Sequence, residues 1–103
     1  MKKLILAAAI AVSLNATAST PVDPCLTLKV TAESIMKARQ GGIDVTVVVD
    51  LAKEGASEEL FKAYMKLIAD AYNQPRFNTK KYKDEAIQEF ANDYYIACWT
   101  GVA

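Results

Sequence analysis

Carboxylates are the residues of this chain best suited to acid–base or metal chemistry, because its 103 residues include no histidine. Histidine is the commonest general base at neutral pH and the commonest protein metal ligand. Adjacent acids occur twice, as Glu58-Glu59 and as Asp84-Glu85. Each pair lies near the start of a predicted helix, where acids interact favourably with the helix dipole. We therefore predict that the pairs are structural, and that the protein is not an enzyme and has no metal or cofactor.

The first residues have the pattern of a secretory signal peptide. A lysine pair precedes an apolar run, and small residues stand at −3 and −1 of a cleavage site before Ser19. The run is shorter than the roughly 20 residues that span a bilayer, and a retained membrane anchor is the alternative. We expect residues 1–18 to be removed and residues 19–103 to form one periplasmic or extracellular domain, with no membrane anchor.

The charge of the predicted mature chain argues against two classes of partner. Without the first two lysines, 10 basic and 12 acidic residues remain. This balance supplies no basic surface for nucleic acid or for an anionic membrane. The expected partner is therefore another protein.

Two cysteines remain after the predicted cleavage, Cys25 and Cys98. In an exported protein an even pair indicates a disulfide. A redox-active pair is the alternative, but the chain has no C-x-x-C motif. Closing a loop of this length stabilises a fold by about 4 kcal/mol in the chain-entropy treatment. We predict a structural disulfide.

Start and stop signals divide the mature chain into four helices. Asp23-Pro24 is a strong helix start, and the Gly41-Gly42 pair is a strong stop. The predicted helices run over 24–40, 45–54, from a Ser57 cap to about 72, and from 78 or 79 to about 99.

The segment 45–54 is ambiguous. Its valines favour a strand by propensity. Val45, Val48, Val49 and Ala52 nevertheless follow helical spacing after a cap at Asp44. We predict a helix and keep a strand as the alternative. The fold class is then all-α, a small four-helix bundle stapled by Cys25–Cys98.

Arg39 is the one charged residue on the apolar stripe of the first helix. The disulfide joins the start of that helix to the end of the last, which predicts an antiparallel pair. Counting an equal number of residues from each cysteine brings Arg39 beside Asp84 or Glu85. We predict a structural ion pair there, and the alternative is a partner-binding role for Arg39.

Aromatic residues are the candidates for partner contact. Tyr95 and Trp99 lie one helical turn apart around Cys98, and Tyr72 and Phe77 lie in and after the third helix. One interpretation is that they cover the disulfide. The other is an exposed protein-binding patch, because tyrosine and tryptophan dominate interface hot spots.

The segments AESIMKARQGG and IADAYNQPRF, set between the two cysteines, resemble a family of small exported proteins of bacteria and their phages. That family shares an A-x-x-I-M-x-x-R-Q-x-G segment, an A-Y-x-x-P turn and a closing cysteine. The resemblance implies a helical, disulfide-stapled fold and carries no activity. In layout alone the chain is similar to HdeA-type acid-stress chaperones and to the phage protein Spackle, which blocks the tail lysozyme of a superinfecting phage.

The expected function is a small periplasmic protein-binding module. It would be an inhibitor or accessory protein for an envelope or cell-wall partner. A phage-related role is one form of this expected function. The alternative is a periplasmic acid-stress chaperone, favoured by the 12 acids, because their protonation would leave a strong positive charge. An enzyme would require a cleft that holds paired carboxylates.

Overall fold

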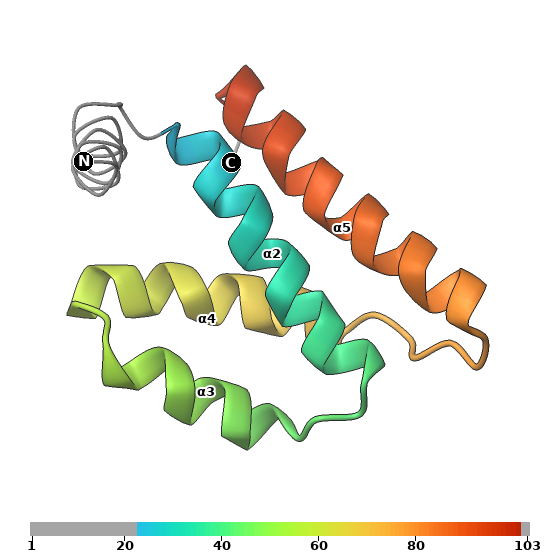
Figure 1. Cartoon of the computed structure of the whole chain (residues 1–103). Coiled ribbons are helices and arrows are strands. Elements are labelled where there is room, and N and C mark those ends of the chain that lie inside the picture. The colour runs from blue at the N-terminus through green and yellow to red at the C-terminus, as the bar shows by residue number, and fades with distance from the viewer. Residues whose placement is uncertain (1–22, 102–103) are drawn as a thin grey trace, which may run out of the picture.

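The fold is all-α, as predicted, in a computed structural model that describes residues 23–101. The predicted signal peptide lies outside these residues. With the labels of Figure 1, the helices are α2 (Pro24–Gln40), α3 (Val45–Glu54), α4 (Glu58–Tyr72) and α5 (Lys80–Thr100). Their bounds agree with the predicted ones to within a residue or two, and the valine-rich segment is helical.

Each helix begins at a polar side chain that accepts a hydrogen bond from a free backbone N–H of the first turn. These N-caps are Asp23, Asp44, Ser57 and Thr79. For α3, Asp44 accepts from the backbone N–H of Thr46 at 2.8 Å. This hydrogen bond lowers the pKa of Asp44 below its usual value. The cap and the packing of α3 on α4 outweigh the strand propensity of the valines.

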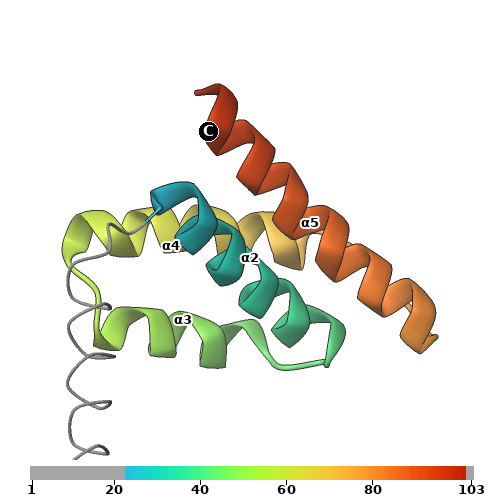
Figure 2. The same ribbon diagram turned by 45° about the horizontal axis from the view of Figure 1, so that its top comes forward.

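The helices form a small bundle in which α2 packs against each of the other three. Figures 1 and 2 show α2 and α5 side by side and antiparallel, with α4 crossing behind α2 and α3 running back along α4. The core lies where α2, α4 and α5 meet. Its buried apolar residues are Ala32, Ile35, Met36, Leu67, Ile68, Ala71, Phe90 and Ala91.

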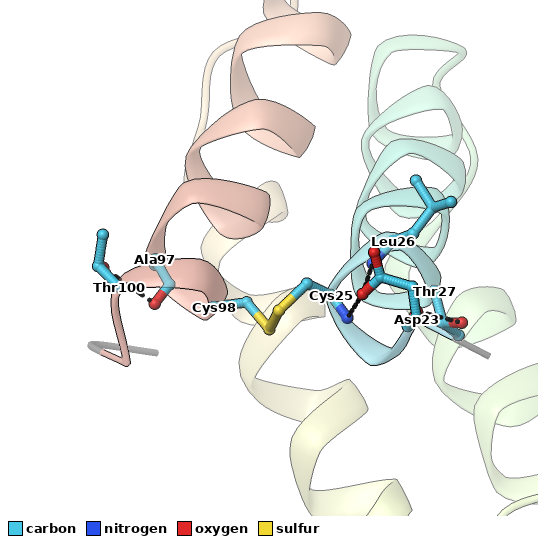
Figure 3. The surroundings of a disulfide bond; sticks show 7 residues. All are labelled: Asp23, Cys25, Leu26, Thr27, Ala97, Cys98 and Thr100. Atoms are coloured by element: carbon cyan, nitrogen blue, oxygen red, sulfur yellow. Dashed lines mark hydrogen bonds between the residues drawn. A yellow bond between two sulfur atoms is a disulfide. The ribbon is translucent and has the colours of Figure 1, made fainter. Parts of the chain in front are cut away.

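The disulfide joins Cys25 in the first turn of α2 to Cys98 in the last turns of α5, with 5.5 Å between the two Cα atoms. Figure 3 shows it beside the Asp23 cap, whose carboxylate accepts from the N–H groups of Cys25 and Leu26. The predicted pairing is therefore confirmed. Because it ties the outer ends of two antiparallel neighbours, it fixes their register.

Candidate functional site

The predicted ion pair between Arg39 and Asp84 or Glu85 does not form. The Nε of Arg39 donates to the backbone oxygen of Gln74 at 2.9 Å, and its guanidinium lies 5.4 Å from the ring centre of Tyr72. Arg39 therefore faces the end of α4 and not α5. Successive helix residues point about 100° apart, so a register correct to one residue can still name the wrong side chain.

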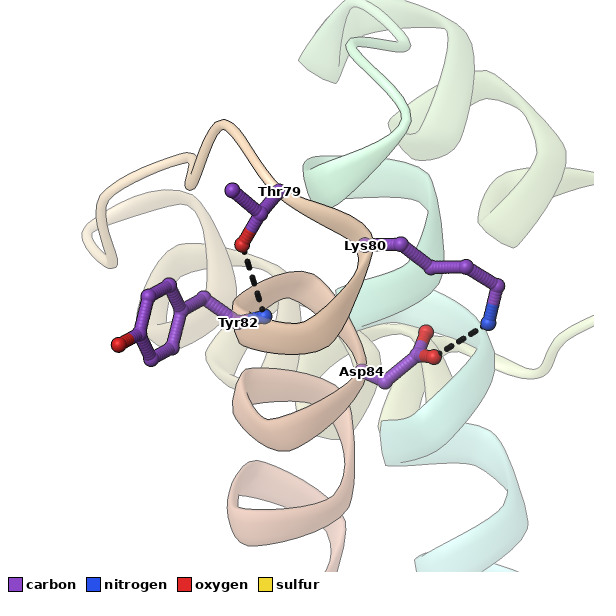
Figure 4. A network of polar contacts seen from close by, with 4 residues as sticks. All are labelled: Thr79, Lys80, Tyr82 and Asp84. Atoms are coloured by element: carbon purple, nitrogen blue, oxygen red, sulfur yellow. Dashed lines mark hydrogen bonds and ion pairs between the residues drawn. The ribbon is translucent and has the colours of Figure 1, made fainter.

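The two carboxylates have other positions. Asp84 pairs with Lys80 on its own helix at 2.6 Å, and Figure 4 shows this pair on the side of α5 away from Tyr82. The hydrogen bond from Lys80 to Asp84 raises the pKa of Lys80. The tie between α2 and the start of α5 is made instead by Lys83, whose Nζ donates to the backbone oxygen of Gln40 at 2.7 Å. The Lys83 cation also interacts favourably with the negative end of the α2 helix dipole.

Gln40 is the buried polar residue that the sequence analysis missed. It is 2% exposed at the end of α2. Its Nε2 donates to the backbone oxygen of Pro75 at 2.8 Å, and its Oε1 accepts from the backbone N–H of Phe77 at 2.9 Å. The amide thus replaces water for two backbone groups of the α4–α5 loop. The sequence feature that could have identified Gln40 as buried is its position four residues after Met36, on the same face of the helix.

The double glycine lets the chain turn sharply at the same point. Gly42 has a φ of +79°. The N–H of Gly42 donates to Arg39 and that of Ile43 to Ala38, the bonding pattern of a Schellman motif. The guanidinium of Arg76 lies against Gly42, 2.9 Å from where a Cβ would stand. The two segments that carry the family resemblance therefore contact one another in space.

Two adjoining cavities open between α4 and α5, with Leu28 and Met36 of α2 in their lining; the larger is mainly apolar and the smaller is about equally polar and apolar. Their volumes are about 470 and about 200 Å³. The cavities share Asp93, and the rings of Phe90 and Tyr94 lie 5.2 Å apart where they adjoin. We call the two cavities together the α4–α5 groove. Its apolar and aromatic walls are Leu67, Phe77, Tyr82, Ala86, Phe90, Tyr94 and Ala97.

One polar contact crosses the groove. The hydroxyl of Tyr94 donates to the Oδ2 of Asp70, and Lys66 lies 3.9 Å from the same carboxylate. Burial raises the pKa of Tyr94, and the contact with Asp70 adds to the rise. The phenol therefore remains a neutral donor across the neutral pH range, and it links α5 to α4.

The remaining acids of the groove lie on one stripe of α5. Glu85, Glu89 and Asp93 follow i, i+4, i+8 spacing along its wall, so they share one side of the helix. None of the three has a cation within 4.0 Å among residues 23–101. We call these three residues the acidic stripe. The sequence predicts Glu85 as a structural helix-start acid and as a possible ion-pair partner of Arg39, whereas in the structure it lines the smaller cavity.

The four aromatic candidates for partner contact divide between two ends of the molecule. Phe77 lines the groove and packs near Tyr82, with ring centres 6.3 Å apart. Tyr95 and Trp99 form a pair at 6.3 Å near the disulfide, far along α5. Trp99 is 65% exposed, while Lys29 lies over the ring of Tyr95.

Tyr72 is engaged inside the protein. Its hydroxyl donates to the backbone oxygen of Ile43 at 2.7 Å, and its ring faces Arg39. Burial raises its pKa; the Arg39 cation opposes the rise and Asp44 adds to it. These contacts favour a role in holding the α2–α3 turn against α4.

Within the described range, no three acidic or cysteine side chains gather in a way that would hold a metal ion. In the same range no helix has the length and apolar character to cross a membrane. Comparisons with family models, curated proteins and solved structures found no match to this chain. The family resemblance therefore stays a prediction.

Proposed function

We propose that this protein is an exported protein-binding module and not an enzyme. It would act in the periplasm or outside the cell, as an inhibitor or accessory protein for an envelope or cell-wall partner. A phage-related role is one form of this function. The α4–α5 groove carries this proposal. Its larger cavity, of about 470 Å³, has the size and the mainly apolar walls typical of recognition sites.

The frame around the groove is braced at both ends of α5, which favours binding without large rearrangement. The disulfide holds the end of α5 to the start of α2. Gln40 and Lys83 hold the α4–α5 loop and the start of α5 to the end of α2. A preformed surface lowers the entropy cost of association.

The test is capture of a partner by the oxidised chain from Ser19, compared with two alanine variants on α4. Ala63 lines the larger cavity and is exposed, whereas Ala69 is exposed on the same helix outside the groove. We expect saturable capture from a periplasmic extract or a phage lysate. Ala63→Trp should abolish it and Ala69→Trp should preserve it. Capture that survives Ala63→Trp, or no saturable capture from either source, would contradict the proposal.

An acid-stress chaperone is the second candidate, and the 12 acids of the chain favour it. Loss of their charge in strong acid would leave a strongly positive chain, whose self-repulsion favours opening of the fold. Circular dichroism and hydrophobic-dye binding from pH 7 to pH 2 test this function. A chain that stays native and binds no dye at pH 2 is not an acid-triggered chaperone.

A further inference from the structure

We infer that the α4–α5 groove binds a cationic amphipathic helix of its protein partner, whose basic residues contact the acidic stripe of α5. This inference rests on the proposed function and specifies the chemistry of the partner segment. Two features carry it, the length of the groove along α5 and the charge along that wall.

The length of the groove suits a short helix that lies over the Tyr94–Asp70 contact. The wall of the groove runs along α5 from Tyr82 to Ala97, which is about four helical turns or roughly 22 Å. A helix that lies in such a groove presents apolar anchors at i, i+3, i+4 and i+7. Added strands need a sheet edge, and residues 23–101 contain no strand.

The charge fits basic residues at matching spacing. Glu85, Glu89 and Asp93 are exposed, stand one turn apart, and lack cationic partners within 4.0 Å among the described residues. Lysines or arginines four residues apart on the partner helix would meet them along one edge. The other wall carries Lys66, which is already paired with Asp70. The groove is therefore net acidic and disfavours an acidic segment.

The test uses two synthetic helical probes of about 15 residues, a length that matches the groove. Both carry leucine on one face, and the other face carries lysine in one probe and glutamate in the second. Each is labelled with fluorescein and titrated with the oxidised chain from Ser19, with binding followed by fluorescence anisotropy. The lysine probe should bind at least about tenfold more tightly than the glutamate probe, as three exposed charge pairs imply.

Two variants with the same change in net charge locate the interaction. The stripe variant is Glu85→Gln/Glu89→Gln/Asp93→Asn. The control is Asp50→Asn/Glu54→Gln/Glu59→Gln, whose residues are exposed on α3 and at the start of α4. The stripe variant should lose about tenfold in affinity for the lysine probe. The control should lose less than about threefold, because distant exposed charges are screened by salt.

Three results would overturn the inference. They are equal binding of the two probes, equal losses in the two variants, and a groove-dependent dimer in sedimentation, which would make a second copy the occupant. Its failure differs from that of the proposed function. A partner captured by the wild type, lost with Ala63→Trp and unaffected by the stripe variant would keep the function and reject the cationic helix. Tighter binding of the lysine probe than of the glutamate probe, with no partner captured from either source, would keep the charge preference of the groove and reject the proposed function.

Discussion

The side-chain oxygen of Gln40 accepts a hydrogen bond from the backbone N–H of Phe77 at 2.9 Å. This contact joins the end of α2 to a loop residue whose ring lines the α4–α5 groove. The amide nitrogen of the same side chain donates to Pro75. A buried polar side chain therefore positions one end of the proposed binding surface.

Gln40→Met should destabilise the protein by roughly 2 to 4 kcal/mol, because the backbone groups of Pro75 and Phe77 would each lose a buried hydrogen-bond partner. Methionine has a similar size, so little of the loss would come from packing. Urea denaturation followed by circular dichroism measures the free energy of unfolding. Gln88→Met, at an exposed position on α5, is the control and should change it by less than about 0.5 kcal/mol. Equal effects of the two changes would show that Gln40 does not hold the loop.

Arg39 should couple energetically to Tyr72 and not to Asp84. A double-mutant cycle with Arg39→Ala and Tyr72→Leu should give a coupling energy of about 0.5 to 1 kcal/mol from the cation–π contact. The cycle with Arg39→Ala and Asp84→Asn should give a coupling close to zero, since Asp84 is paired with Lys80. A larger coupling energy for Arg39 and Asp84 than for Arg39 and Tyr72 would instead support the ion pair that the sequence register predicts.

Gly42→Ala should cost about 1 kcal/mol or more, because alanine disfavours the positive φ at this position. The added Cβ would also meet the Arg76 guanidinium. Gly55→Ala is the matched control, since a Cβ there meets nothing within 4 Å and φ is −124°. It should be neutral or slightly stabilising. Thermal unfolding compares both variants with the wild type, and equal melting temperatures for the two would contradict the Schellman geometry.

Tyr94 should make stability fall at alkaline pH. Its pKa is raised in the folded state by burial and by Asp70, whereas an unfolded tyrosine ionises near pH 10. The folded state therefore keeps the phenol proton longer, and this contribution is complete below about pH 10 and lost as the pH rises above it. Urea denaturation at pH 9 and pH 11 should show a smaller fall for Tyr94→Phe than for the wild type.

Tyr82→Phe is the control for that comparison, because Tyr82 is an exposed tyrosine on the same helix. It should show nearly the wild-type fall. Some slope should remain in both variants, since burial also raises the pKa of Tyr72. If Tyr94→Phe keeps the full slope, its hydroxyl does not contribute to the alkaline loss.

Local signals predicted most of the fold. Asp23, Asp44, Ser57 and Thr79 are short-range caps that mark helix starts without reference to the rest of the chain. The two cysteines then predicted that α2 and α5 are antiparallel neighbours. Even the valine-rich α3 was predictable, because its helical spacing and its Asp44 cap agreed.

The site was harder to predict because it depends on directions and distances between elements. Arg39 and Gln40 are neighbours in sequence, yet one reaches Gln74 and the other Phe77. Nothing in helical periodicity describes the α4–α5 loop that they bind. The spacing of Glu85, Glu89 and Asp93 is readable in the sequence, but the groove beside them exists only through the relative placement of α4 and α5.

Site-specific photo-crosslinking in cells that export the chain tests most directly whether the α4–α5 groove is the binding surface. A photoreactive amino acid replaces Glu89, which lines the groove, or Lys53, which is exposed on α3. We predict a discrete crosslinked partner from position 89, suppressed by Ala63→Trp, and none from position 53. The same products from both positions, or none from position 89, would contradict a binding role for the groove.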